Sequence, residues 1–312
     1  MFRSFRSITA AAGLALALTA CSTGEDDQVA GVPAFPLDAP SVTLLNPGDD
    51  PQDVHYTSGD EWDTTVAVSD GVNQQVIAPG KDVPAEAPAG GDVDKTTLPL
   101  TVASVGAPAP GAGEEDADAR VDVVVGSGKH SNLDVGQDVA ASEGFRVSWR
   151  ADASGRISTL KLLAPPDAPE RGLQQVEPAL LALVNSAVVF PDDPIGPGAS
   201  WTVEHRVAGD TATVRTTTYT LVSREGDTLT LNTAVDERPQ RSDVEIDGAG
   251  QLDGQNVSIE SAKTTSEGQL VVDLSRPLPV SGQSAWTTRL IYGGNDAARV
   301  VQDITRAVQY GV

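Results

Sequence analysis

The segment Thr228-Leu229-Thr230-Leu231-Asn232-Thr233-Ala234-Val235 carries the pattern that decides the fold. Leu229, Leu231 and Val235 share one face of an extended chain, and polar residues occupy the other face. Because successive side chains of a strand point to opposite sides of a sheet, this alternation predicts a strand with one buried face. The preceding Arg224-Glu225-Gly226-Asp227 predicts a tight turn.

Similar strand composition recurs on both sides of this segment. After it, we expect strands over residues 257–263, 268–274 and 286–292. Before it, we expect strands over residues 41–45, 62–68, 72–77, 98–105, 121–125, 145–149, 157–163, 201–207 and 211–222. Ser69-Asp70-Gly71 and Ser266-Glu267-Gly268 are expected to be turns between neighbouring strands. Tight turns between consecutive strands favour antiparallel pairing.

One helix is predicted in the middle of the chain, near residues 169–188. Its apolar residues recur at spacings of three and four: Leu173, Val176, Leu180, Val184 and Ala187. Pro169 suits the first turn, where its missing N–H has no partner to lose. Pro178 interrupts the hydrogen-bond ladder, so we expect the helix to be kinked or split in two there.

These elements predict a mainly β fold, in which a large, antiparallel, curved sheet carries one central helix packed on it. We expect a single domain over residues 40–312, with a core of Val, Leu, Ile and Ala because aromatic residues make up only 4% of the chain. Residues 300–310 fit a strand or a helix, and the surrounding strands favour a strand. Residues 78–94 and 107–119 are rich in Pro, Gly and acidic residues and are predicted as long loops, the second one mobile.

The amino terminus carries the clearest functional signal. Leu18-Thr19-Ala20-Cys21 closes an apolar segment, residues 10–18, that follows the basic Arg3 and Arg6. This is the pattern of a secretory signal peptide. The apolar segment is far shorter than the ~20 residues that a membrane-spanning helix needs. An ordinary signal peptide with a coincidental cysteine is the alternative to the interpretation that follows.

The same four residues resemble the lipobox of bacterial lipoproteins. The resemblance implies that residues 1–20 are a signal peptide cleaved after Ala20, and that Cys21 carries a diacylglyceryl lipid and palmitate. Residues 21–39 would then be the lipidated cysteine and a flexible acidic tether, because the segment is rich in Gly, Asp, Glu and Pro. Since Cys21 is the only cysteine, its acylation would leave no disulfide in the mature chain.

The net charge constrains the partners. The chain has a formal net charge of −23, and removal of residues 1–20 with Arg3 and Arg6 makes it −25. Such a charge repels nucleic acid and anionic lipid headgroups. We therefore expect no nucleic-acid partner, and we expect attachment to the extracytoplasmic face of the cell membrane through the covalent lipid on Cys21.

A second resemblance covers roughly residues 40–312. It lies in the proline-rich turn Phe190-Pro191-Asp192-Asp193-Pro194-Ile195-Gly196-Pro197-Gly198-Ala199-Ser200-Trp201, in Thr216-Thr217-Thr218-Tyr219-Thr220-Leu221 and in Val42-Thr43-Leu44-Leu45-Asn46-Pro47-Gly48. With the lipobox, these stretches are similar to a β-rich family of exported bacterial proteins, the actinobacterial-type cell-envelope lipoproteins. The resemblance implies an envelope protein and transfers no catalytic residue.

Motifs for catalysis or metal binding fail on inspection. Val121-Asp122-Val123-Val124-Val125-Gly126-Ser127-Gly128-Lys129-His130 lacks the first glycine and the Ser or Thr of a phosphate loop, so a strand ending in a glycine turn is predicted. Asp243-Val244-Glu245-Ile246-Asp247-Gly248 begins like a calcium loop but has Gly254 at the twelfth position, which favours a strand and turn. His55, His130 and His205 are scattered, without metal-ligand spacing.

The function predicted from these observations is that of a non-enzymatic binding or scaffolding module of the cell envelope. We expect no catalytic residue, no metal ligand and no cofactor, and an envelope protein or a lipid as ligand. The alternative is a lipid or glycolipid carrier that uses a groove between sheet and helix. A groove lined by Leu and Val would favour the carrier, whereas a filled core would favour the binding module.

Overall fold

A computed structural model describes residues 28–312 except 208–212, 241–242, 247–254 and 294–297. The predicted signal peptide, residues 1–20 with Ala20, and the predicted lipidation site Cys21 lie outside the described residues. Within the part of the chain that is described, no helix is long and apolar enough to cross a membrane.

The described strands form one antiparallel sheet of 15 strands, which confirms the predicted mainly β class. The strands of the first half are β1 (Phe35–Pro36), β2 (Ser41–Asn46), β3 (Trp62–Ile77), β4 (Asp94–Gly106), β5 (Ala119–Val125), β6 (Lys129–His130), β7 (Arg146–Ala151) and β8 (Ile157–Leu163). Those of the second half are β9 (Ser200–Val207), β10 (Thr213–Glu225), β11 (Thr228–Pro239), β12 (Asp243–Ile246), β13 (Gln255–Asp273), β14 (Ser281–Gly293) and β15 (Arg299–Tyr310). Residues 300–310 are thus a strand, as favoured above.

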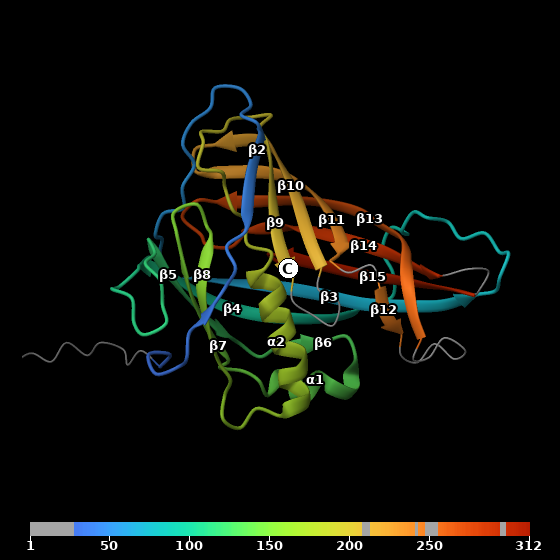
Figure 1. The fold of residues 1–312 in the computed structure, drawn as a ribbon. Coiled ribbons are helices and arrows are strands. Elements are labelled where there is room, and N and C mark those ends of the chain that lie inside the picture. The colour runs from blue at the N-terminus through green and yellow to red at the C-terminus, as the bar shows by residue number, and fades with distance from the viewer. Residues whose placement is uncertain (1–27, 208–212, 241–242, 247–254, 294–297) are drawn as a thin grey trace, which may run out of the picture.

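The strand order explains the curvature of the sheet. It runs β1-β8-β7-β5-β4-β3-β15-β14-β13-β11-β10-β9-β2, with β6 beside β4 and β12 beside β13. The two edge strands, β1 and β2, are consecutive in the chain and are separated only by residues 37–40. Such a connection spans at most about 18 Å. The sheet therefore curls until its edges approach each other, and residues 37–40 form a strap across the gap (Figure 1).

The main core fills the concave side of this sheet. Alternate residues of each strand point inward, as Leu229 and Leu231 of β11 do, and both are fully buried. Trp201 of β9 is also fully buried, stacks on Tyr219 at 5.4 Å between ring centroids and packs against Phe190 at 5.8 Å. The proline-rich turn of residues 190–201 is thus part of the core.

Two helices lie together beside the sheet, where one was predicted (Figure 1). The predicted helix is α2 (Glu170–Val184), a single helix that contains Pro178, so the expected split in two does not occur. Pro169 is its N-cap residue. The second helix, α1 (Leu133–Ala140), was not predicted; its N-cap Asn132 accepts a hydrogen bond from the N–H of Asp134.

Two predicted turns are wrong, because each lies inside a long strand. Residues 69–71 belong to β3, which pairs with β15 without interruption from Val66 to Ile77. Residues 266–268 belong to β13. Gly71 and Gly268 are needed for close approach instead: a Cβ at Gly71 would overlap the carbonyl of Asp92, and one at Gly268 would overlap the hydroxyl of Thr233.

The long loop predicted at residues 78–94 lies against the outer face of β13–β15. Arg289 donates to the carbonyl of Pro84 at 3.0 Å, and Thr265 donates to the carbonyl of Ala87 at 2.8 Å. The loop thereby covers the ion pair of Arg289 with Asp303, whose atoms approach to 2.7 Å. This explains why Asp303 is buried on the outer face of the sheet.

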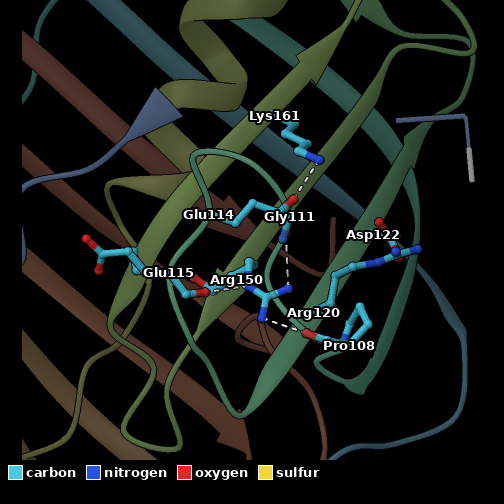
Figure 2. A network of polar contacts seen from close by, with 9 residues as sticks. Pro108, Gly111, Glu114, Glu115, Arg120, Asp122, Arg150 and Lys161 are labelled. Carbon is cyan, nitrogen blue, oxygen red and sulfur yellow. Dashed lines mark hydrogen bonds and ion pairs between the residues drawn. The ribbon is translucent and has the colours of Figure 1, made fainter. Parts of the chain in front are cut away.

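The second long loop, residues 107–118, is docked on the outer face of β5, β7 and β8 (Figure 2). Glu114 lies between Lys161, at 2.6 Å, and Arg150, at 3.4 Å. Arg150 also donates to the carbonyls of Pro108 and Glu115. The N–H of Gly111 donates to Glu114, which closes the loop on itself. Charge pairing, rather than apolar burial, therefore fixes this acidic segment.

The segment expected to be a flexible tether, residues 21–39, is partly built into the domain. Phe35 and Pro36 pair with Leu160 and Thr159 as strand β1, and Val29 is buried. Leu37 adds a hydrogen bond from its N–H to the carbonyl of Ser158. In the described part of this segment, the chain thus already contacts the sheet from Val29 onward.

Candidate ligand-binding groove

A groove of about 820 Å³ opens between α2 and the concave face of the sheet. Its walls come from the strap, from α2 and from strands β1, β3, β4, β6, β9, β10, β14 and β15. A volume of ~300–1,000 Å³ is typical of small-molecule sites, and such sites lie preferentially in concave positions.

The lining is mixed in character. Apolar atoms come from α2 and from the sheet, at Pro178, Ala182, Leu181, Val68 and Val308. Charged and polar lining residues are Asp38, Asp70, Asp94, His130, Gln174, Gln175, Asn185, His205, Arg206, Arg215 and Arg306. Most inward-facing Leu and Val side chains pack in the filled core, so few of them line the groove.

One row of side chains crosses β9, β10 and β11, and its members on β9 and β10 form the floor of the groove at the polar end. His205, Arg215 and Glu237 are direct cross-strand neighbours. They share the inward face with core residues two positions away, such as Val203 and Thr217. Arg215 is 6% exposed and Glu237 3% exposed, so this row places two charges inside the protein.

A seam in the sheet lies beside this row. Backbone pairing between β11 and β13 ends at Asn232. Beyond Asn232, side-chain hydroxyls of β13 take the place of backbone carbonyls as acceptors. The N–H of Val235 donates to Ser266 at 2.8 Å, and the N–H of Glu237 donates to Thr264 at 3.0 Å. These bonds satisfy the freed N–H groups and fix the position of Glu237.

A second row, across β3, β15 and β14, completes the cluster. Asp70, Arg306 and Trp286 are cross-strand neighbours. Arg306 contacts Glu237 at 3.3 Å and Asp70 at 3.8 Å. The guanidinium of Arg215 lies over the ring of Trp286, 5.2 Å from its centroid, which is a cation–π contact. We call His205, Arg215, Glu237, Trp286 and Arg306 the arginine cluster.

Several polar atoms of the arginine cluster have no hydrogen-bond partner among the described residues: Arg215 Nε, Glu237 Oε1 and Trp286 Nε1. Arg215 Nε and Glu237 Oε1 are 3.8 Å apart, which is too long for a hydrogen bond. The other carboxylate oxygen of Glu237, Oε2, accepts hydrogen bonds from Arg306 and Thr288. Buried polar groups are normally paired, so orphaned ones mark a place for water or a ligand.

Burial decides the protonation of this cluster. Burial, together with the smaller effect of the neighbouring Arg215 charge, lowers the pKa of His205 to about 4. The imidazole is therefore neutral at pH 7. Burial also lowers the pKa of Arg215, while Glu237 opposes that effect. An arginine keeps its charge in proteins even so, and the positive charge of Arg215 thus remains inside the groove.

The structure places the residues singled out from the sequence in several regions. His130 and His205 both line the groove, whereas His55 lies near Asp192, whose pKa Arg156 and His55 lower. Gly126 and Gly128 form the turn between β5 and β6, which confirms the strand-and-glycine-turn prediction. Residues 243–246 are strand β12, and residues 247–254 of that apparent calcium loop lie outside the described residues. Within the described ranges, no group of three His, Cys, Asp or Glu could hold a metal ion.

Sequence reasoning missed Arg215, Glu237, Trp286 and Arg306. A signal for one of them was present, because Glu237 falls two residues after Val235 on the face that Leu229 and Leu231 mark as buried. A charge on an apolar face is unusual and is a reason to look for a partner. The partners themselves come from strands far apart in the sequence, so only the sheet order brings them together.

No model of a known protein family matches this chain, and a search of curated proteins finds no match.

Proposed function

We propose that this protein is an exported, lipid-anchored binding module of the cell envelope, and that it holds its ligand in the groove between α2 and the sheet. The observation that carries the proposal is the groove itself, about 820 Å³ in volume, with buried and unpaired polar atoms at one end. Binding sites commonly combine an apolar wall with a few placed polar groups, as this lining does.

The lipid anchor rests on the amino-terminal sequence. Cys21 lies eight residues before Val29, the first buried residue in the part of the chain that the structure describes. Such a segment spans at most about 29 Å when extended. Acylation of Cys21 would hold the domain near the outer face of the membrane despite the net charge of −23, because each buried CH₂ contributes ~0.8 kcal/mol and two or more acyl chains bind stably.

The anchor is tested by labelling cells with a palmitate analogue. We expect label and membrane fractionation for the full chain, and neither for Cys21→Ser. Ser22→Ala serves as the matched control and should behave like the unaltered chain. Unlabelled full chain in the soluble fraction would contradict the anchor.

The groove is tested by the melting temperature of the unlipidated mature chain, residues 21–312 with Cys21→Ser. We expect an envelope extract to raise the Tm, because a ligand that binds only the folded state stabilises it. Ala182→Trp fills the groove from α2 and should remove the shift. Glu177→Trp, on the exposed side of the same helix, should keep it.

A lipid carrier is the second candidate. The apolar wall made by Pro178, Leu181 and Ala182 favours it, while the charged floor and the filled core favour a smaller, more polar ligand. The same Tm assay separates the two candidates. A shift from the water-soluble extract alone supports a polar ligand, and a shift from the chloroform-soluble extract alone supports the carrier.

A further inference from the structure

We propose that the polar end of the groove is a subsite for an anionic group, a carboxylate or a phosphate, which binds to Arg215 with Trp286 and Arg306 beside it. This inference rests on the proposed ligand-binding function and specifies the chemistry of the ligand. The inference depends on the positions of four side chains and on which of their polar atoms are paired. These side chains are Arg215, Glu237, Trp286 and Arg306.

The first step is a count of charges in the arginine cluster. Arg215 and Arg306 bring two positive charges, and Glu237 is the only buried carboxylate that contacts either of them among the described residues. The other carboxylate, Asp70, is 54% exposed and 3.8 Å from Arg306, so solvent screens it. One buried carboxylate is thus shared by two guanidinium groups, and a positive charge is left over.

The second step is the hydrogen-bond balance. Two buried N–H donors, Arg215 Nε and Trp286 Nε1, have no acceptor in the described part of the chain. One buried acceptor, Glu237 Oε1, has no donor there and is out of hydrogen-bond range of Arg215 Nε. Both residues that carry the unpaired donors line the groove, whereas Glu237 does not. A groove ligand that contacts these two residues would therefore need an acceptor, and the surplus charge favours an anionic one.

The third step is preorganisation. The ring of Trp286 supports the guanidinium of Arg215 from one side. Glu237 is fixed by Thr264 and by Thr288, and it contacts Arg306 through Oε2. Arg215 is therefore held in place before any ligand arrives, as binding in a low-dielectric site requires. Neutral His205 beside it adds no competing charge.

The fourth step is the arrangement of charge along the groove. The carboxylates of the lining, Asp38, Asp70 and Asp94, come from the strap, β3 and β4. The arginines come from β9, β10 and β15. Asp70 and Asp94 are direct cross-strand neighbours, so the acidic side of the groove is one patch. An anion would be repelled there and attracted to the floor, which gives the ligand one orientation.

The experiment compares four probes on the unlipidated mature chain: tetradecanoate, tetradecyl phosphate, tetradecanol and inorganic phosphate. Calorimetry or tryptophan fluorescence gives each Kd. We expect the two anionic amphiphiles to bind at least 10-fold more tightly than tetradecanol. This comparison uses the unaltered groove, so it does not depend on a variant that folds.

The variant Arg215→Gln should weaken the anionic amphiphiles about 10- to 100-fold and leave tetradecanol unchanged, since a charge-assisted hydrogen bond is lost. Arg238→Gln changes an exposed arginine that lies outside the groove, so it is the matched control and should change each Kd less than 3-fold. Trp286→Phe should weaken the anions by a smaller factor, because it removes one donor and keeps the ring.

The outcomes separate this inference from the proposed function. Equal binding of anionic and neutral amphiphiles, or no effect of Arg215→Gln, would overturn the anionic subsite while the groove function stands. No binding of any amphiphile together with no Tm shift from either extract would overturn both. Inorganic phosphate that binds as tightly as tetradecyl phosphate would support the subsite and identify a free anion, rather than a lipid headgroup, as the ligand.

Discussion

At the scale of single residues, the protein separates two kinds of buried polar group. Trp201 is fully buried and fully paired: its Nε1 donates to the carbonyl of Val189 at 2.8 Å. Trp286 is also buried, but its Nε1 has no partner among the residues that the structure describes. The first arrangement stabilises the fold, and we attribute the second to ligand binding.

Trp201→Phe should lower the free energy of unfolding by about 2–4 kcal/mol, because it leaves the Val189 carbonyl unpaired and opens a cavity in the core. Urea unfolding at pH 7 measures this loss. Trp62→Phe is the control, since the indole of Trp62 is only partly buried and its Nε1 has no partner to lose among the described residues. A loss below about 1 kcal/mol for Trp201→Phe would contradict the role assigned to this bond.

His205 should make the protein less stable in acid. Its pKa is about 4 in the folded state and close to 6.5 in the unfolded chain, so the unfolded chain binds an extra proton between these values. The free energy of unfolding therefore falls as the pH drops from about 6.5 to about 4, by about 2 kcal/mol for a ring that is partly exposed. His205→Gln should remove this part of the pH dependence.

The measurement is urea unfolding of both proteins at several values between pH 7 and pH 4. Carboxylates with a lowered pKa, such as Glu114 and Asp192, also stabilise the folded protein less in acid, but this loss is the same in both proteins. The difference between the two curves isolates His205. Parallel curves over this range would show that the imidazole is not buried as described.

At the scale of elements, two acidic loops cover the outer face of the sheet, and charge pairing holds one of them. The pKa of Glu114 is lowered by the hydrogen bond from Lys161, by the N–H of Gly111 and by Arg150. Figure 2 shows the side chain of Glu115 pointing away from this network. The two neighbouring glutamates thus provide a matched pair for measuring what the pairing contributes.

Glu114→Gln should lower the free energy of unfolding by about 1–2 kcal/mol at pH 7, because Lys161 and Arg150 lose their carboxylate. Glu115→Gln should have almost no effect. The lowered pKa stabilises the folded state above the unfolded pKa of about 4.5, and this contribution disappears as the pH falls through the lower folded value. The two variants should therefore converge in acid, and a gap that does not narrow as the pH falls would contradict the assignment.

The elements also show what the sequence could and could not predict. Alternation in residues 228–235 predicted β11, because a single strand with one buried face is a local feature. The apparent turns at residues 69–71 and 266–268 were wrong, because Gly71 and Gly268 admit a loop carbonyl and a neighbouring hydroxyl rather than a chain reversal. Those contacts come from residues distant in the sequence and leave no local signal.

Helix α1 is an element that the sequence pattern did not predict. Its eight residues bury only Val139, so almost no apolar period marks it. It is held instead by close packing on α2, where Gly172 lies against the carbonyl of Asp138. The N-cap Asn132 was the one local signal that could have revealed it.

At the scale of the whole molecule, the curled sheet and α2 create the groove. The sheet approaches closure because its edge strands β1 and β2 are joined by only residues 37–40. Helix α2 fills part of the concave side with Leu180 and Leu183, and the groove remains beside it. The sequence predicted a curved sheet with a helix across it, but the arginine cluster depends on strand order and could not be predicted from local patterns.

The most direct test of this account is mass spectrometry of small molecules extracted from residues 21–312 with Cys21→Ser, expressed in an actinobacterial host and purified without detergent. We predict about one co-purifying anionic ligand per chain, retained in Glu177→Trp and depleted at least 10-fold in Ala182→Trp. A chain that carries no ligand, or equal amounts of ligand in both variants, would contradict the claim that the groove is the binding site.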